Sequence, residues 1–211
     1  MLAAIVTIAG LKYHRMQSAI ADIEAAGYAV QYVQAGPKWV RSVAGDKVVD
    51  WFNPVFSVVR TTMNANPDRP AINRILSRLP DLPALQEVFL PSPYMMDDDL
   101  VTLSRVPRLE NLCLARTSIS GVGFKHLQKL TALRTLDLSD TALTDDGLRA
   151  LGTLTQLTSL SLDGAVITDE GLAHLTPLKN LRRLSLSNTG VSESASERLR
   201  EAIPDLEVTD D

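Results

Sequence analysis

The stretch LRTLDLSDTALTDDGLRALGTLTQ, residues 133–156, is followed at once by LTSLSLDGAVITDEGLAHLTPLKN, residues 157–180. Both open with the pattern Leu-x-x-Leu-x-Leu. This pattern recurs with a 24-residue period in units that start at residues 85, 109, 133, 157 and 181, with Val88 as its one departure. A fixed period of 20 to 50 residues is typical of stacked structural repeats. The chain is therefore predicted to contain an array of five such units.

Each unit is predicted to hold one short strand and one short helix. Alternate side chains of a strand point to opposite faces, so Leu136 and Leu138 point inward while Asp137 points outward. Thr144 and Asp145 then supply an N-cap oxygen and negative charge to the first turn of a helix. No unit can bury its leucines alone, so the units must stack and the end units must differ.

The repeated unit resembles the leucine-rich repeats, more closely the bacterial ones with a T-x-[IL]-T-D-x-G-L signature, as in TALTDDGL at residues 141–148. Those repeats are in turn similar to the cysteine-containing repeats of F-box proteins. The resemblance covers about residues 82–206. It implies an α/β fold, a short leucine-rich repeat solenoid with a curved parallel sheet and convex helices, preceded by a small α/β capping segment.

The chain is predicted to divide near residue 80. Residues 1–80 are interpreted as the capping α/β segment, which covers the apolar edge of the first repeat. Residues 81–211 are interpreted as the repeat array with a C-terminal cap that includes a shortened strand at residues 204–208. The elements expected in the capping segment are helices at 13–27 and 67–79, a strand at 28–33, an extended run at 48–59, a short helical stretch after Gly36-Pro37, and a core with Trp39 and Trp51.

The first 11 residues form an uncharged apolar run that ends at Lys12, with His14 and Arg15 close behind. The run is about half of the ~20 residues that span a bilayer. Two interpretations stay open: a buried first strand or helix turn, or the end of a membrane anchor that begins upstream. Bacterial proteins of this resemblance often carry an N-terminal hydrophobic anchor. We expect a cytoplasmic protein, with membrane anchoring as the alternative if the apolar run continues upstream.

Charge is divided unevenly along the chain, whose net charge is −4. Residues 1–80 carry 9 Lys and Arg against 5 Asp and Glu, whereas residues 81–211 carry 12 against 20. An acidic array disfavours nucleic acid as a partner, because cationic groups supply most of the affinity for phosphate backbones. Cys113 is the single cysteine, which excludes an intramolecular disulfide, and its place in the repeat puts an unreactive thiol on the outward face of a strand.

Motifs for catalysis or for a cofactor are missing from the sequence. There is no GxxxxGK[ST] phosphate loop and no GxSxG nucleophile elbow. His126 and His174 occupy the same repeat position on the helical side, which favours a solvated face over a metal site. The run Asp97-Asp98-Asp99 aligns with the predicted helix starts and is interpreted as helix capping. We expect no cofactor, no metal and no catalytic activity.

The outward face of the sheet is the predicted functional surface, because packing leaves its side chains free to vary. Five strands about 4.8 Å apart give a face of only about 200 Å², against roughly 800 Å² per partner in a standard interface, so the loops after the strands must take part. The residues expected to bind are Phe89, Asn111, Arg116, Thr135, Asp137, Ser139, Asp140, Ser159, Ser161, Asp163, Arg183, Ser185 and Asn188.

The predicted function is that of a non-catalytic protein–protein interaction module, with a protein partner that presents a basic or polar surface. A solvated sheet without a partner is the plainest rival interpretation. An F-box-like targeting adaptor is another alternative, although no convincing F-box precedes Leu85. A membrane-tethered structural module is the third, with an upstream anchor as the only expected route to a membrane.

Overall fold

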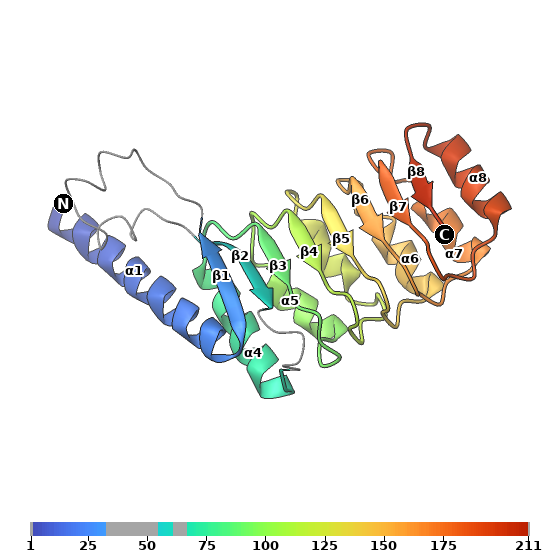
Figure 1. The fold of residues 1–211 in the computed structure, drawn as a ribbon. Coiled ribbons are helices and arrows are strands. Elements are labelled where there is room, and N and C mark those ends of the chain that lie inside the picture. The colour runs from blue at the N-terminus through green and yellow to red at the C-terminus, as the bar shows by residue number, and fades with distance from the viewer. Residues whose placement is uncertain (1, 33–54, 61–66, 211) are drawn as a thin grey trace.

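The computed structural model of the 211-residue chain describes residues 2–32, 55–60 and 67–210. In these residues eight strands lie side by side in one sheet, in chain order from β1 to β8 (Figure 1). The strands are β1 (Tyr28–Tyr32), β2 (Val55–Arg60), β3 (Glu87–Phe89), β4 (Asn111–Cys113), β5 (Thr135–Asp137), β6 (Ser159–Ser161), β7 (Arg183–Ser185) and β8 (Glu207–Thr209). The α-helices are α1 (Leu2–Ala25), α4 (Arg69–Arg78), α5 (Leu100–Leu103), α6 (Asp145–Leu151), α7 (Asp169–Leu172) and α8 (Glu193–Ala202), with 3₁₀ helices at Leu79–Asp81, Asp97–Asp99, Phe124–Lys129 and Ala173–Leu175.

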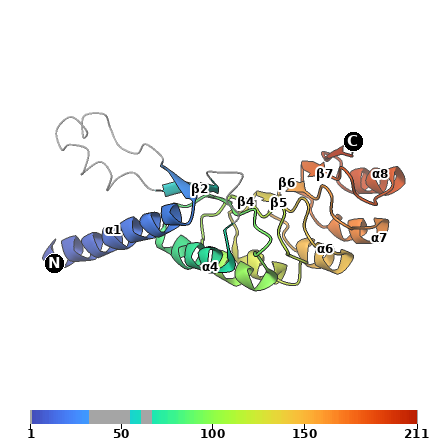
Figure 2. The ribbon, with the colours of Figure 1, turned by 60° about the horizontal axis from the view of Figure 1, so that its bottom comes forward.

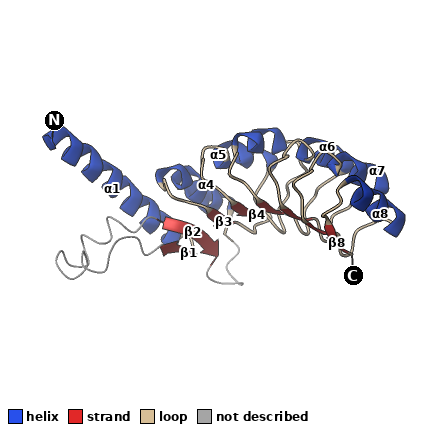
Figure 3. Cartoon of the chain, turned by 90° about the horizontal axis from the view of Figure 1, so that it is seen from above, coloured by secondary structure: helices blue, strands red, loops and turns tan. Residues whose placement is uncertain are grey.

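The repeat period sets the register of the sheet. Strands β2 to β8 are parallel, and from β3 to β7 each residue pairs with the residue 24 positions further along the chain. Leu112 thus pairs with Leu136 and Leu136 with Leu160, and all three side chains are buried. The helices of the repeats lie on the convex side of the array, and the sheet forms the other side (Figure 3). The predicted strand alternation and the curved solenoid are both confirmed.

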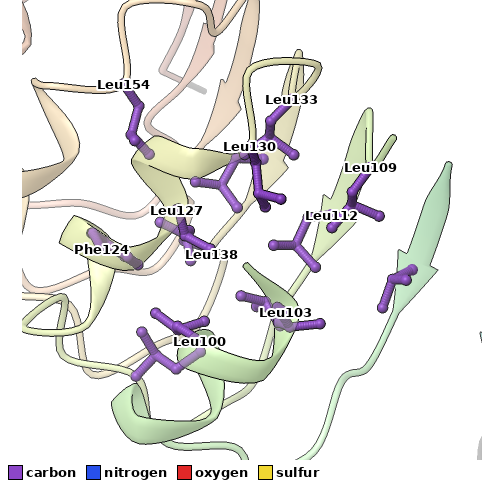
Figure 4. Packing of buried hydrophobic residues seen from close by; sticks show 14 of the residues in the cluster. Leu100, Leu103, Leu109, Leu112, Phe124, Leu127, Leu130, Leu133, Leu138 and Leu154 are labelled. Carbon is purple, nitrogen blue, oxygen red and sulfur yellow. The ribbon is translucent and has the colours of Figure 1, made fainter. Parts of the chain in front are cut away.

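Stacked leucines fill the space between sheet and helices. Figure 4 shows Leu103 of α5 and Leu112 of β4 pointing into the same layer as Leu127 and Leu138. Each buried leucine stabilises the fold by roughly 1.5–3 kcal/mol relative to an exposed one. The threonine of the repeat has a structural role as well, since the buried Thr141 hydroxyl donates to the Leu138 carbonyl at 2.7 Å.

The prediction that the Thr144 side chain caps its helix by a hydrogen bond was wrong. Thr144 stands at the N-cap position of α6, but its side chain makes no capping hydrogen bond. The Asp145 carboxylate instead accepts from Thr168 of the next unit, from the backbone amide at 3.0 Å and from the hydroxyl at 2.7 Å. Asp169 accepts from Ser192 in the same way. These aspartates therefore join adjacent units rather than cap their own helices.

Asp97 and Asp99 of the acidic run also act between segments. Asp97 accepts from the backbone amides of Ser120, Gly121 and Gly123, each at 3.0 Å. Burial raises the pKa of Asp97, but these hydrogen bonds outweigh it and hold the pKa below its ordinary value. Asp99 does accept from the Met96 amide, as a cap would, and it also pairs with Arg69.

A glycine follows Asp145 and Asp169 by two positions, where the units are closest. A Cβ atom on Gly171 would overlap the Asp145 carboxylate, and a Cβ atom on Gly147 would overlap the Ser120 carbonyl oxygen. Stacking thus explains the Asp-x-Gly part of the repeat. The carboxylate of one unit packs so closely against the glycine backbone of the next that a side chain there would not fit. In the first unit, Asp99 stands at this glycine position and faces α4 through its pair with Arg69.

The N-terminal segment continues the sheet of the array. Strand β1 pairs antiparallel with β2, and β2 pairs parallel with β3. Helix α4 falls within the predicted range, and α1 ends before Gly27, whose positive φ of 84° suits a helix stop. The expected helix at 13–27 was placed too late, since α1 begins at Leu2 and the apolar run is helical. Trp39, Trp51, the short helical stretch and residues 48–54 lie outside the described residues.

Helix α1 packs on α4 and β1 through the residues that follow Leu11, in the part of the helix whose side chains are described. Its buried residues are Met16, Ala19, Ile20 and Ile23, at the spacing of one helical face, whereas Leu11 is 59% exposed. Figure 2 shows the first turns of α1 extending away from the array. Among the described residues, no helix combines the length and the apolar character that crossing a bilayer requires.

Candidate functional site

The outward face of the sheet brings the predicted strand residues together in three rows. The rows run across the strands, because the 24-residue register places equivalent residues side by side. From β3 to β7 they are Glu87, Asn111, Thr135, Ser159 and Arg183; Phe89, Cys113, Asp137, Ser161 and Ser185; and, just after the strands, Pro91, Ala115, Ser139, Asp163 and Ser187. Arg183 is exposed and the rest are half-buried.

Asp137 lies at the centre of this face and is held in one orientation. Its Oδ1 accepts from the Ser139 backbone amide at 3.0 Å and from the Ser139 hydroxyl at 2.6 Å. Its Oδ2 accepts from the Cys113 thiol at 3.2 Å. The carboxylate is thereby fixed by neighbours on its own strand and on the preceding one.

Asp163 is held in the same way one unit further on. It accepts from the hydroxyls of Ser161 at 3.1 Å and Ser185 at 2.6 Å, and from the Ser187 amide at 2.9 Å. The hydroxyls of Ser139 and Ser161 lie 2.7 Å apart and connect the two carboxylates. We call this set the carboxylate network; it consists of Cys113, Asp137, Ser139, Ser161, Asp163, Ser185 and Ser187.

The charge of the carboxylate network is not balanced by cations. Within the residues that the structure describes, neither Asp137 nor Asp163 takes part in an ion pair. Both accept only from neutral donors, which orient a carboxylate without neutralising it. The face therefore presents two fixed negative charges on adjacent units.

Cys113 is a donor in this network rather than a nucleophile. Burial, together with the nearby Asp137 carboxylate, raises the pKa of its thiol to about 12. The thiol is protonated at neutral pH, and thiolate chemistry needs the opposite shift. This agrees with the expected unreactive cysteine, half-buried on the outward side of β4.

The predicted loop residues share one backbone conformation. Arg116, Asp140 and Asn188 have φ values of 57°, 54° and 55°, and Gly164 occupies the same repeat position with φ 68°. Asp, Asn and Gly adopt this left-handed region more readily than other residues, so Arg116 is the unusual occupant. Its Nε lies 3.5 Å from Oδ2 of Asp140, and both side chains are largely exposed. They place one cation and one anion at the edge of the face.

The two ends of the face differ in character. Phe89 is half-buried at the β3 end, two residues after Glu87, whose Oε1 accepts from the Asn111 side-chain amide at 3.0 Å. Arg183 is exposed at the β7 end. The residues predicted to bind did not include Glu87, Cys113 and Ser187, although the row alignment places all three on this face. The Ser187 contact could not be predicted from its side chain, because its backbone amide makes it.

The helical side carries the two repeat histidines, as predicted. His126 and His174 lie in the 3₁₀ helices of the second and fourth units, and both are half-buried. Over residues 2–32, 55–60 and 67–210, no group of three or more His, Cys, Asp or Glu side chains is arranged to hold a metal ion.

Comparisons with known proteins agree with the repeat fold. Residues 107–167 match the family model described as leucine rich repeat. Internalin C2 of Listeria monocytogenes is 21% identical, with a TM-score of 0.52 over 72% of this chain and 68% of that chain. A leucine-rich repeat protein of Leptospira interrogans is 26% identical (TM-score 0.45; 62% of this chain, 32% of that one), and the Listeria monocytogenes internalin inlF is 19% identical (0.43; 64% and 44%). No curated protein matches the sequence. The chain thus has a leucine-rich repeat fold.

Proposed function

We propose that this chain is a non-catalytic protein-interaction module that binds its partner through the outward face of the sheet and the loops beside it. The observation that carries the proposal is the carboxylate network, whose Asp137 and Asp163 are oriented by neutral donors and have no cationic partner among the described residues. Fixed charges that are already oriented lose little conformational entropy when a partner binds.

The partner is expected to be a protein with basic groups beside an apolar patch. Basic groups would complement Asp137 and Asp163, which raises the association rate and disfavours acidic competitors. Phe89, two strands from Asp137 in the same row, would supply the apolar contact. Aromatic anchors of this kind are typical of interface hot spots.

The loops are needed to make the interface large enough. The strand rows alone offer about 200 Å², and a standard interface buries roughly 800 Å² on each side. Arg116, Asp140 and Asn188 extend the face on the side where the strands end. We infer that a partner spans both the rows and this edge.

Capture from an extract of the native cell, followed by binding kinetics, tests the proposal. The double variant Asp137→Asn with Asp163→Asn removes the two charges and keeps the shape, and Phe89→Ala removes the apolar contact. Both should weaken capture at least tenfold, about 1.4 kcal/mol. His126→Ala with His174→Ala is the matched control on the helical side. Loss of capture in the control, with the face variants unaffected, would place the binding surface on the helices instead.

Membrane attachment is the second candidate function, and helix α1 motivates it. Residues 2–11 contain no charged residue, the helix extends from the array there, and Lys12, His14 and Arg15 follow. Cations that flank an apolar helix favour anionic lipid surfaces. Flotation with anionic vesicles tests this idea, and Lys12→Glu with Arg15→Glu should abolish it. Equal flotation of this variant would remove the support for attachment through α1.

A further inference from the structure

The convex side of the array carries an exposed ridge formed by the helices (Figure 3). In each unit, three repeat positions of the helix and the turn after it point outward, and all of these residues are exposed. From the second unit to the fifth, the triplets are Val122, Lys125 and Lys129; Asp146, Arg149 and Thr153; Glu170, Ala173 and Pro177; and Ser194, Glu197 and Glu201. We call these twelve residues the convex ridge.

The charge of the convex ridge reverses between its ends. Lys125 and Lys129 occupy the same two repeat positions as Glu197 and Glu201, which follow 72 residues later, three periods along the chain. None of these four side chains takes part in an ion pair within the described parts of the chain. Like charges four residues apart on an α-helix, as Glu197 and Glu201 are on α8, are mutually unfavourable. The stability of a single chain therefore does not explain why two like charges stand together at each end of the ridge.

A second copy of the same chain is the partner that this pattern fits. Consider a twofold axis that runs parallel to the helices and passes between the third and fourth units. It places the second unit of one copy opposite the fifth unit of the other, so Lys125 meets Glu197 and Lys129 meets Glu201. Closed twofold contacts of this kind use the same surface on both copies. We propose that the chain forms an antiparallel homodimer through the convex ridge.

The middle of the ridge combines like and opposite charges, because Asp146 would lie opposite Glu170 of the second copy. Arg149 would lie opposite Ala173 of the second copy, beside the Glu170 carboxylate one helical turn away. Thr153 would lie opposite Pro177. Two convex surfaces touch at the centre and diverge at the ends. Thr153, Ala173 and Pro177 are small enough for the close contact at the centre, and the long Lys and Glu side chains at the ends can reach across the wider gap.

The size of the contact predicts a weak dimer. Seven helical residues span about 10 Å, and four units with helices roughly 10 Å apart span about 40 Å, which gives an area on the order of 400 Å² per copy. This is about half of a standard interface, and its ion pairs are exposed to solvent. The dimer should therefore form only at high protein concentration and low salt. It would leave both outward sheet faces free, which makes a bivalent particle.

Sedimentation equilibrium of the full chain at several hundred micromolar tests the proposal. We expect a monomer–dimer equilibrium at 50 mM NaCl, and an association constant at least about tenfold lower at 500 mM, because salt screens exposed ion pairs. The variant Lys125→Glu with Lys129→Glu should be monomeric, and so should Glu197→Lys with Glu201→Lys. An equimolar mixture of the two variants should dimerise again, because each then presents the charges that the other needs.

Matched controls distinguish the loss of this contact from a general effect of changed charge or of unfolding. Arg108→Glu with Arg134→Glu changes the same number of exposed cations away from the ridge and should leave the association constant unchanged. Melting temperatures of all variants show that the fold is retained. A wild-type chain that stays monomeric at 50 mM NaCl overturns the proposal. A dimer that persists in the reversed variants, or a mixture that stays monomeric, overturns the antiparallel pairing.

Discussion

Two groups of aspartates in the same array contrast with each other. Asp97, Asp145 and Asp169, each the first residue of its helix, accept from the next unit and join the stack. Asp137 and Asp163, on the sheet face, accept from serine hydroxyls, from the Cys113 thiol and from two backbone amides. Asp97 satisfies the backbone amides of Gly121 and Gly123, which are buried and would otherwise be left without a partner. The donors of Asp145 and Asp169 lie on the exposed residues Thr168 and Ser192. The donors of Asp137 and Asp163 lie on the open sheet face, where water can replace a carboxylate as acceptor. Losing these two carboxylates should therefore cost little unfolding free energy.

The largest expected effect lies on the inward side of the strands. Leu136→Asp would bury an unpaired carboxylate among leucines, at a cost of several kcal/mol. That is comparable to the whole stability of a domain, about 5–15 kcal/mol. The array should unfold, whereas Asp137→Leu on the outward side should remain folded. Thermal melts of both variants check this, and equal melting temperatures would contradict the assignment of faces.

Removing the N-terminal segment should be nearly as disruptive. Deleting residues 1–80 would uncover β3 and the Asp99 carboxylate, which pairs with Arg69. Exposed parallel edges and apolar surface favour aggregation. We expect an insoluble or oligomeric product on size-exclusion chromatography. A folded monomer of residues 81–211 would show that this segment is a separate domain rather than a cap.

Gly147→Ala tests the close contact between units. Its Cβ would overlap the Ser120 carbonyl oxygen, and backbone atoms yield less than flexible side chains. We expect a loss of about 1–3 kcal/mol in unfolding free energy, measured by urea denaturation. Gly190→Ala is the milder comparison, because its nearest neighbour, the Ile167 oxygen, lies 3.1 Å away. Equal losses in the two variants would argue against this explanation of the repeat glycine.

Acid should weaken the hydrogen bonds by which the aspartates join adjacent units. The pKa of Asp97 in the folded protein is below its ordinary value of 3.8. Its contribution is therefore fully present above about pH 4 and is lost as the pH falls through the folded pKa. Between pH 5 and pH 2, the unfolding free energy from urea denaturation should fall more steeply with decreasing pH for the wild type than for Asp97→Asn. Parallel curves would show that Asp97 does not contribute in this way.

The sequence predicted the period, the alternation and the rows of the face, because each follows from the spacing of leucines. It did not predict the partners of the repeat aspartate, since an N-cap and a bond to the next unit call for the same residue at the same position. The start of α1 was missed because a short apolar run fits either a strand or a helix. The serine contacts of Asp163 depend on the distance between neighbouring strands, which only the fold supplies.

The unfolding free energy of Asp97→Asn, set beside that of Asp137→Asn with Asp163→Asn, tests the contrast between the two groups most directly. Urea denaturation at pH 7 gives both values. Asp97→Asn should lose about 1–3 kcal/mol, because at least one buried amide loses its acceptor. The double variant should lose less than about 0.5 kcal/mol, as surface substitutions usually do. If the double variant lost as much as Asp97→Asn, the carboxylate network would be part of the folding of the array, and the proposed binding face would lose its support.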